Sequence, residues 1–336
     1  MQNTEKIVRN KITIISFICS LIVIWIHTYN LAEYGITAND TGLKGIVYLI
    51  EYYWSHIVGF AVPTFFFISG FLFFRTFEWS KLKQKYLSRI KSILVPYFIW
   101  CNIYFFIYVV LAHLPIFRTY FYEPKYELTF HNWLMALWPE CFYTLWFLRN
   151  LIVFIAIAPL LYYLLKNLKN IPIGTIAVII VLANSCFNFL NLPMGLDLYM
   201  LGCYTAINHK DVVYYRNKSL SYIGIGIILI CLLTMSVAIN SITVLLFSVS
   251  IWFLLDLFDL EMELPWWLSI TFFIYVGHGL VLAALEKSLL LIGGQNPWLA
   301  LFDYVFMPFI TVIVLTIIAR VLKKNKQLWN LLSGYR

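Results

Sequence analysis

Residues 12–30 read ITIISFICSLIVIWIHTYN, and this apolar stretch decides the fold class. A helix needs roughly 20 apolar residues to cross the ~30 Å hydrocarbon core of a bilayer, and this run has that length. It lacks a small-residue cleavage site, so we expect it to remain as a membrane span and not to be removed as a signal peptide. The stretch also raises a question, because it places an ionisable ring, His27, where hydrocarbon is expected.

The composition of the whole chain is typical of an integral membrane protein. Of its 336 residues, 62% are hydrophobic and only 12% are charged, whereas soluble domains carry about 25% charged residues. The net charge is +8, but the basic residues lie in short clusters between apolar runs without a nucleic-acid motif, so we expect no nucleic-acid partner. The six cysteines show no CxxC or metal spacing, and we expect neither a disulfide nor a metal site.

Apolar runs recur along the chain and predict about ten transmembrane helices in a single domain over residues 1–336. Their approximate limits are 12–32, 46–74, 92–113, 143–165, 171–189, 194–208, 220–238, 241–258, 266–291 and 298–322. The sequence therefore predicts an all-α, polytopic membrane helix bundle.

Basic residues between the predicted spans set the expected orientation. If the N-terminus is cytoplasmic, most of the 24 Lys and Arg residues fall in inner segments. The outer segments then hold only Lys44, Arg118, Lys125 and Lys287. Because cytoplasmic loops of membrane proteins are enriched in Lys and Arg, we expect both termini in the cytoplasm and membrane lipids around the bundle.

Several ionisable side chains fall inside predicted spans at a similar depth. At a rise of about 1.5 Å per residue, four of them lie about 8 to 9 Å below the outer face: His27, Glu51, Arg149 and Asp303. His278 comes out deeper, near mid-membrane. Charged groups are costly in lipid and usually face a bundle interior or a wet cavity.

The first predicted span carries a polar stripe. Ser16, Ser20 and His27 share one helix face, which indicates the lining of a cavity. Structural alternatives stay open at this point: Glu51 and Asp303 could snorkel to headgroups, and Arg149 could form an ion pair. The histidines could simply donate to backbone carbonyls.

Five segments of the chain carry a family resemblance: ISFICSLIVIWIHTYN, AVPTFFFISGFLFFRTF, SRIKSILVPYFIW, YTLWFLRNLIVFIAIAPLLYYLL and FFIYVGHGLVL. In this order and at these spacings they resemble acyltransferase family 3 of bacterial membrane proteins. Members move acyl groups, most often acetyl, from cytoplasmic acyl-CoA to hydroxyls of surface sugars or envelope polymers. The resemblance implies a multi-pass enzyme of the bacterial inner (plasma) membrane, with acetyl-CoA as donor substrate and no bound cofactor.

The resemblance also assigns roles to single residues. His27 falls on the essential histidine of the family, Arg149 on the Arg of the WFLR segment, and His278 in the IY..H segment. Ser69 and Gly70 fall on the Ser-Gly-Phe motif of the family. These residues are the expected catalytic and substrate-binding positions.

One departure from the family pattern concerns the donor side. Many members have an Arg eleven positions before the histidine, where this chain has Ser16, and Lys11 lies on a different part of the helix. In the basic loop 75–91, Arg75, Arg89 or Lys91 could bind the phosphates of coenzyme A. The alternative is an ordinary basic tether on anionic headgroups.

The expected chemistry is attack of a sugar hydroxyl on a thioester. His27 would act as general base and Glu51 would orient its imidazole, while Arg149 or backbone donors at Ser69 and Gly70 stabilise the oxyanion. Direct transfer and an acyl-histidine intermediate both remain open.

The aromatic outer loop 114–142 offers a place for the acceptor. Its rings could form an interface belt or stack on sugar rings, with His131 and Trp133 as first candidates. We expect an O-acetyltransferase acting on an exopolysaccharide, a capsule or another envelope glycan, with a surface glycan or lipid-linked sugar as acceptor. The alternatives are an exporter of polysaccharide or lipid-linked sugar and, less directly, a membrane sensor without chemistry.

Overall fold

Helices build almost all of the structure. The computed structural model describes residues 2–138, 142–168, 171–187, 190–234 and 241–335. Within these ranges there is no named strand, and the one isolated β-bridge joins Leu168 to Ile171. The all-α prediction is confirmed for the described residues.

Four helical segments are long and apolar enough to cross a membrane. They are residues Thr4–His27 of α1 (Gln2–His27), the segment Trp79–His113, α14 (Thr271–Gly293) and α15 (Pro297–Leu322). A bent pair, α8 (Trp146–Ala156) and α9 (Ala158–Leu165), counts as a fifth if it is one span. The prediction of about ten spans stays a prediction, because the other apolar helices are shorter.

Prolines account for two breaks within predicted spans. The predicted span 46–74 is divided into α2 (Gly42–Ile57) and α3 (Ala61–Phe74) by a 3₁₀ turn, and Pro63 lies in the first turn of α3, where its missing N–H needs no partner. Pro159 lies in the first turn of α9 and cannot donate back into α8, and the two axes differ by 67°.

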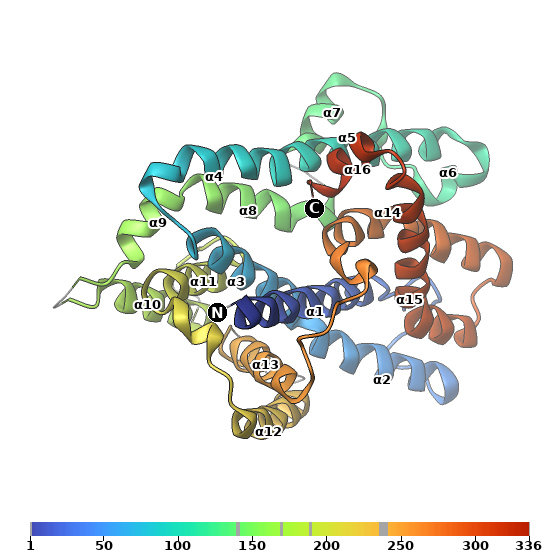
Figure 1. The fold of residues 1–336 in the computed structure, drawn as a ribbon. Coiled ribbons are helices and arrows are strands. Elements are labelled where there is room, and N and C mark those ends of the chain that lie inside the picture. Colours follow the sequence, from blue (N-terminus) through green and yellow to red (C-terminus); the bar gives the residue numbers. More distant parts are fainter. Residues whose placement is uncertain (1, 139–141, 169–170, 188–189, 235–240, 336) are drawn as a thin grey trace.

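Helices α4 (Leu82–Arg89) and α5 (Val95–His113) belong to the segment Trp79–His113. The remaining helices are α6 (Pro115–Phe121), α7 (Phe130–Leu137), α10 (Ile173–Phe187), α11 (Leu196–Asn208), α12 (Lys218–Thr234), α13 (Ser241–Leu254) and α16 (Lys326–Ser333). Figure 1 shows α1 in the middle of the bundle, with α14 and α15 beside each other on one flank and α12 and α13 on another.

Helices α3 and α11 pack closely against each other. A Cβ on Gly70 would lie 2.3 Å from the Tyr199 carbonyl oxygen, and one on Gly202 would lie 2.1 Å from the Phe67 carbonyl oxygen. Small residues let two helix backbones approach in this way. Gly70 therefore serves helix packing, and the substrate-binding role expected from the sequence stays a prediction.

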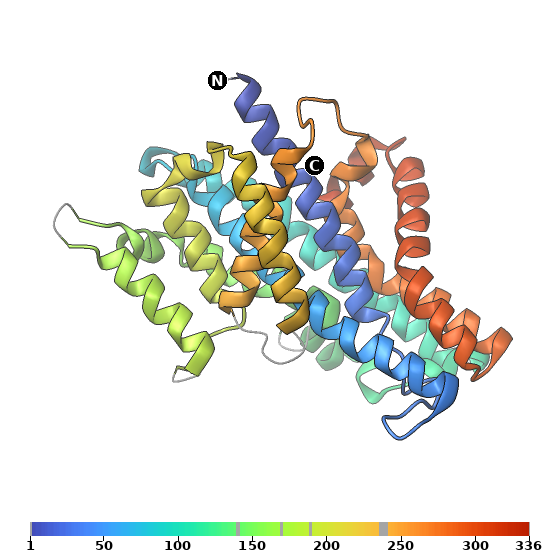
Figure 2. The ribbon, with the colours of Figure 1, turned by 90° about the horizontal axis from the view of Figure 1, so that it is seen from below.

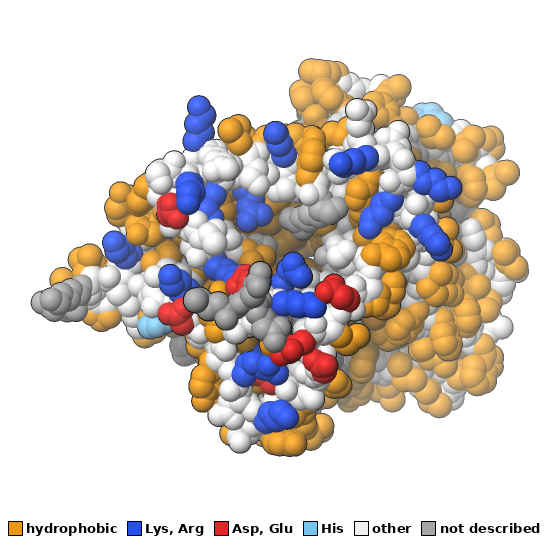
Figure 3. All heavy atoms as spheres, in the orientation of Figure 1, with side chains coloured by type: hydrophobic (Ala, Val, Ile, Leu, Met, Phe, Trp, Pro, Cys, Tyr) orange, Lys and Arg blue, Asp and Glu red, His pale blue; other side chains and the backbone are white. Residues whose placement is uncertain are grey.

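Both ends of the described chain lie at the same end of the molecule, as Figure 2 shows. We call this the inner end and the opposite one the outer end. Lys and Arg side chains spread over the inner face in Figure 3, whereas apolar side chains cover the flanks. Leu233, for example, is 79% exposed. Exposed apolar flanks fit contact with lipid, and the cytoplasmic assignment of the inner end stays a prediction.

Four cysteines of the described part of the chain are buried thiols. They are Cys19, Cys101, Cys203 and Cys231. Cys141 lies outside the described residues, as does the side chain of Cys186.

Candidate active site

Two histidines stack at the outer end of α1. His27 is the last residue of α1 and His278 lies in α14; their ring centroids are 5.2 Å apart and their planes differ by 18°. Depth estimates from the sequence separated these residues, and the structure brings them together. The reason is register: Ser20 Oγ lies 3.5 Å from the Thr271 carbonyl oxygen, and each histidine follows seven residues later on its helix.

His278 has a defined hydrogen-bonding state. Its ring is fully buried, and Nδ1 lies 2.5 Å from the Tyr275 carbonyl oxygen. Because a carbonyl can only accept, Nδ1 is the donor of this bond. Nε2 is buried and has no hydrogen-bond partner among the described residues. The structural alternative for His278, a bond to a backbone carbonyl, thus holds for one of its nitrogens.

His27 borders an outer cavity of about 650 Å³. Its ring is half-buried and belongs to the cavity wall, together with Trp146 of α8. Two further polar residues, Asn184 and Asp197, line the same cavity. A polar molecule that enters from the outer end can therefore reach the imidazole of His27.

An inner cavity of about 330 Å³ lies between the inner halves of α1, α3, α8 and α14. Hydroxyl groups are frequent on its wall: Thr13, Ser16, Ser69, Ser269, Thr271 and Tyr275. Arg89 is the one charged residue among its lining residues, and it forms no ion pair with any described carboxylate. The inner cavity thus offers hydroxyls and one guanidinium.

Arg89 owes its place to an irregular turn. Residues Ile90–Leu94 form a π-helical turn between α4 and α5. Pro96 follows in the first turn of α5 and has no N–H to donate to the carbonyl of Ser92, so the regular ladder fails here. Such π-turns are frequent at functional sites.

Aromatic rings separate the two cavities. Phe65, Phe147 and Tyr275 line the inner cavity, whereas Phe66 lines the outer one. The rings of Phe66 and Phe147 are 4.5 Å apart, and those of Phe147 and Tyr275 are 5.4 Å apart. We call these four residues the aromatic partition. The histidine pair adjoins it, since the rings of Tyr275 and His278 are 5.9 Å apart.

Comparison with known proteins decides the family. A family model described as an acyltransferase domain matches residues 10–320, nearly the whole chain. The chain belongs to acyltransferase family 3. No curated protein and no solved structure matches it. Membership and the apolar helices together make this protein a membrane acyltransferase.

Glu51 and Asp303 lie deep inside this acyltransferase, with exposures of 0% and 1%, so neither snorkels to the surface. Glu51 Oε2 accepts the backbone N–H of Asn30 at 3.3 Å, and Asp303 Oδ2 accepts the Asn30 side-chain amide at 2.8 Å. The hydroxyl of Tyr34 donates to the same Asp303 oxygen at 3.3 Å. These bonds hold the chain that leaves α1 three residues after His27.

Arg149 of the acyltransferase is half-buried on α8, one turn after Trp146 of the outer cavity wall. Its neighbour Asn150 donates to the Met194 carbonyl oxygen at 3.2 Å, and Met194 also lines that cavity. Arg149 itself is not among the described lining residues of the outer cavity, although Trp146, one turn before it, is.

Arg75 of the acyltransferase is held by other residues of the chain. Its guanidinium donates to both carboxylate oxygens of Glu5 and to the hydroxyl of Tyr214. Of the four residues that the sequence assigned to substrate binding, Ser69 and Arg89 line the inner cavity, while Arg75 and Gly70 serve contacts between helices.

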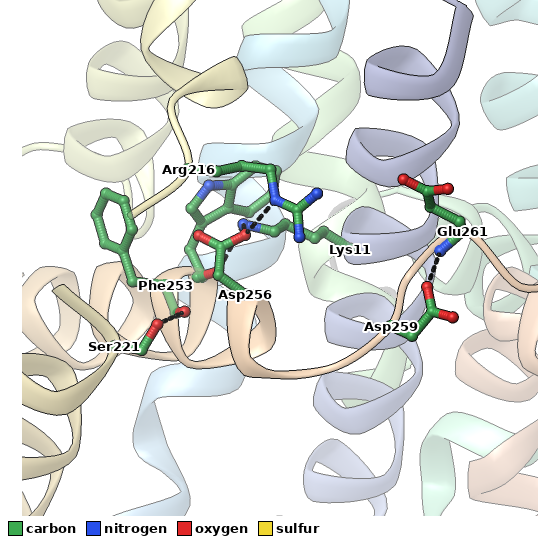
Figure 4. A network of polar contacts seen from close by, with 8 residues as sticks. Lys11, Arg216, Ser221, Phe253, Asp256, Asp259 and Glu261 are labelled. Carbon is green, nitrogen blue, oxygen red and sulfur yellow. Dashed lines mark hydrogen bonds and ion pairs between the residues drawn. The ribbon is translucent and has the colours of Figure 1, made fainter. Parts of the chain in front are cut away.

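Lys11 of the acyltransferase does not face the inner cavity. It pairs with Asp256 at 2.7 Å, and both side chains are 1% exposed. Arg216 approaches the same carboxylate at 3.3 Å, and Figure 4 shows Lys11 and Arg216 converging on Asp256. Ser16 does line the inner cavity, so Arg89 supplies the cation that neither Ser16 nor Lys11 provides there.

The sequence did not point to Asp197 or Asn184 on the outer cavity wall. Asp197 is the one acidic residue in the predicted span 194–208, and that intramembrane charge was the available signal. The predicted polar stripe is also divided, because Ser16 lines the inner cavity, His27 lines the outer one, and Ser20 is buried against α14.

Proposed function

We propose that this protein is an O-acyltransferase of the bacterial cell membrane. It moves an acyl group, in the first instance acetyl, from cytoplasmic acyl-CoA to a hydroxyl of an exopolysaccharide, a capsule or another envelope glycan. The observation that carries the proposal is the position of the stacked histidine pair next to the aromatic partition, between an inner cavity with a guanidinium and an outer cavity with polar walls.

The donor fits the chemistry of the inner cavity. Arg89 is a half-buried guanidinium without a described carboxylate partner, and guanidinium forks suit the phosphate oxygens of coenzyme A. The surrounding hydroxyls of Ser16 and Ser69 suit the amides of the pantetheine arm. The thioester at the end of that arm would pass the aromatic partition to reach the histidine pair.

The transfer itself needs one base and one acyl donor. His27 takes the proton of a glycan hydroxyl while its oxygen bonds to the thioester carbonyl carbon. The carbon–sulfur bond then breaks, and the leaving thiolate receives the proton that His27 holds. The oxyanion that forms during attack needs a positive charge or N–H donors, and we assign this role to Arg149. Glu51 and Asp303 act indirectly, because their hydrogen bonds to Asn30 hold the chain that follows His27.

Replacing His27 by Ala tests the proposal. Membranes carrying the wild-type protein should release free coenzyme A from acetyl-CoA and acetylate the glycan of the host cell, and His27→Ala should abolish both reactions. The variant should still accumulate in the membrane, because the half-buried ring contributes little packing.

His113→Ala is the matched control, since His113 is an exposed histidine at the end of α5. It should keep full activity. Retained glycan acetylation in His27→Ala would contradict the assignment. A wild-type protein that neither cleaves acetyl-CoA nor transfers acetyl would favour the exporter.

A further inference from the structure

A separate cavity of about 430 Å³ lies at the outer end, and the proposed reaction does not use it. Its wall combines residues of α5, α7 and the segments around them with Gly279 of α14. Its aromatic and polar lining residues include Tyr104, Tyr108, Tyr126, His131, Asn132 and Phe142. The volume falls within the range of about 300 to 1,000 Å³ that is usual for small-molecule sites.

One side of this cavity is a wall of nearly parallel rings. Tyr108 stacks on Tyr126 with centroids 4.9 Å apart and on Phe142 with centroids 5.6 Å apart. The planes of Tyr126 and Phe142 differ by only 2°. Aromatic faces carry partial negative charge, so a face that this stack leaves open to the cavity attracts the polarised C–H groups of a ligand ring.

Polar atoms lie on the same cavity wall. Thr144 is 2% exposed, and its Oγ1 has no hydrogen-bond partner among the described residues. Asn132 uses its amide N–H groups on the carbonyls of Pro124 and Glu127, which leaves its Oδ1 as an acceptor. A buried hydroxyl without a partner is costly, and a hydroxyl-rich ligand would satisfy it.

The cavity does not favour an anion. Lys125 is the one Lys or Arg among its described lining residues, and Lys125 pairs with Glu123 at 2.6 Å. The cavity thus offers aromatic rings, the Thr144 hydroxyl and the Asn132 amide oxygen, and in the part that the structure describes it has no net positive charge. A neutral sugar ring suits this combination.

The cavity also reaches the backbone of the histidine pair. Gly279 follows His278 directly and lines the cavity. A Cβ at Gly279 would lie 2.7 Å from the Tyr104 hydroxyl oxygen and 2.8 Å from Thr144 Cγ2, so glycine lets the wall close at this point. A group bound here lies beside the helix segment that carries His278.

We propose that this cavity is a binding subsite for a neutral pyranose ring of the acceptor glycan, next to the ring that is acylated. The inference rests on the proposed function for the identity of the chain that it binds. The aromatic wall holds the ring face, while Thr144 Oγ1 and Asn132 Oδ1 bond its hydroxyls. The subsite would thereby select the glycan and not the donor.

The test uses the purified full-length protein in detergent and the methyl glycosides of glucose, galactose and N-acetylglucosamine as probes. Saturation-transfer NMR measures their contact with the protein. Wild type should transfer saturation to at least one probe, and Thr144→Val and Tyr126→Leu should each reduce that signal at least fivefold. Thr144→Val keeps the side-chain shape, so it separates the lost hydroxyl from lost folding.

Tyr222→Leu is the control, because Tyr222 is a 67% exposed tyrosine on α12. It should leave the signal unchanged. In acyl transfer, the KM for the glycan should rise about tenfold in both cavity variants, while kcat and the KM for acetyl-CoA stay as in wild type.

Three results would overturn the subsite. They are the absence of saturation transfer to every sugar probe, equal signals in wild type and both cavity variants, and, with glycerol phosphate as an added anionic probe, transfer to it without transfer to any sugar. Failure of the proposed function would look different: no acetyl transfer by wild type at all, with the sugar contacts still dependent on Thr144 and Tyr126.

Discussion

The two ends of α1 hold buried charge in opposite ways. At the inner end, Lys11 and Arg216 meet the buried carboxylate of Asp256, so cation faces anion. At the outer end, the described hydrogen bonds of the buried carboxylates come from neutral groups. Those groups are the backbone and side-chain amides of Asn30 and the hydroxyl of Tyr34.

The two arrangements have different structural roles: the ion pairs hold distant segments together, and the neutral hydrogen bonds set local geometry. Paired charges in a dry interior tie distant segments together, and losing one partner strands the other. Neutral donors on a carboxylate fix local geometry without an opposite charge. The chain around Asn30 follows His27 directly, so the outer arrangement orients the histidine end of α1, while the inner one closes the bundle.

Asp256→Asn should have the largest effect on stability. It removes the carboxylate charge that faces the buried Lys11, and breaking a buried pair typically costs about 3 to 5 kcal/mol. Chemical unfolding of the purified protein in detergent measures the loss. Asp259→Asn, an exposed carboxylate in the same loop, is the control and should cost well under about 1 kcal/mol.

The double variant Lys11→Met, Asp256→Leu sharpens this result, because an apolar pair of similar volume can replace a buried ion pair. It should recover at least half of the lost stability. If the double variant recovers no stability, the loss in Asp256→Asn has a cause other than the unpaired charge of Lys11.

Arg89→Gln should have the next largest effect, on the donor. Arg89 lines the inner cavity and forms no ion pair with any described carboxylate. Loss of a charge-assisted bond of about 1.5 to 3 kcal/mol predicts a rise of about 10- to 100-fold in the KM for acetyl-CoA. Steady-state release of free coenzyme A measures it.

Arg75→Gln is the matched control for Arg89→Gln. Arg75 already binds Glu5 and Tyr214, so the KM for acetyl-CoA should change by less than about twofold. If both variants change the KM for acetyl-CoA equally, Arg89 does not bind the donor specifically, and the basic loop acts only as a membrane tether.

Asp303→Asn should have the smallest effect, although the residue is as buried as Asp256. An asparagine oxygen can still accept from Asn30 and Tyr34, so the cost should be about 1 kcal/mol, with activity close to wild type. The same unfolding and acyl-transfer assays apply. If Asp303→Asn loses as much stability as Asp256→Asn, then Asp303 has a charged partner, and the two ends of α1 do not differ in the way described above.

Local pattern in the sequence was enough for the class of fold and for the family. Hydropathy predicted the helices, and ordered motifs predicted the acyltransferase family that the family model confirms. His27 was selected from its motif, and the structure places it on a cavity wall. These features depend on residues that are close in the chain.

Contacts between distant segments could not be predicted in this way. The stacking of His27 on His278 depends on the register of α1 against α14, which a residue count from uncertain span limits misses by several residues. The partner of Lys11 is 245 positions away, and the packing role of Gly70 depends on α11. Such pairings follow from tertiary packing and carry no local signal.

The aromatic partition has a consequence for the permeability of the membrane. An enzyme with cavities open to opposite faces risks a continuous water path, through which protons would leak and discharge the membrane potential. Phe65, Phe66 and Phe147 place apolar rings between the two cavities, and water leaves narrow apolar constrictions readily. An acyl chain on a slender arm can displace rings that a hydrated ion cannot. The same rings would thus let acyl groups cross while the membrane stays electrically tight.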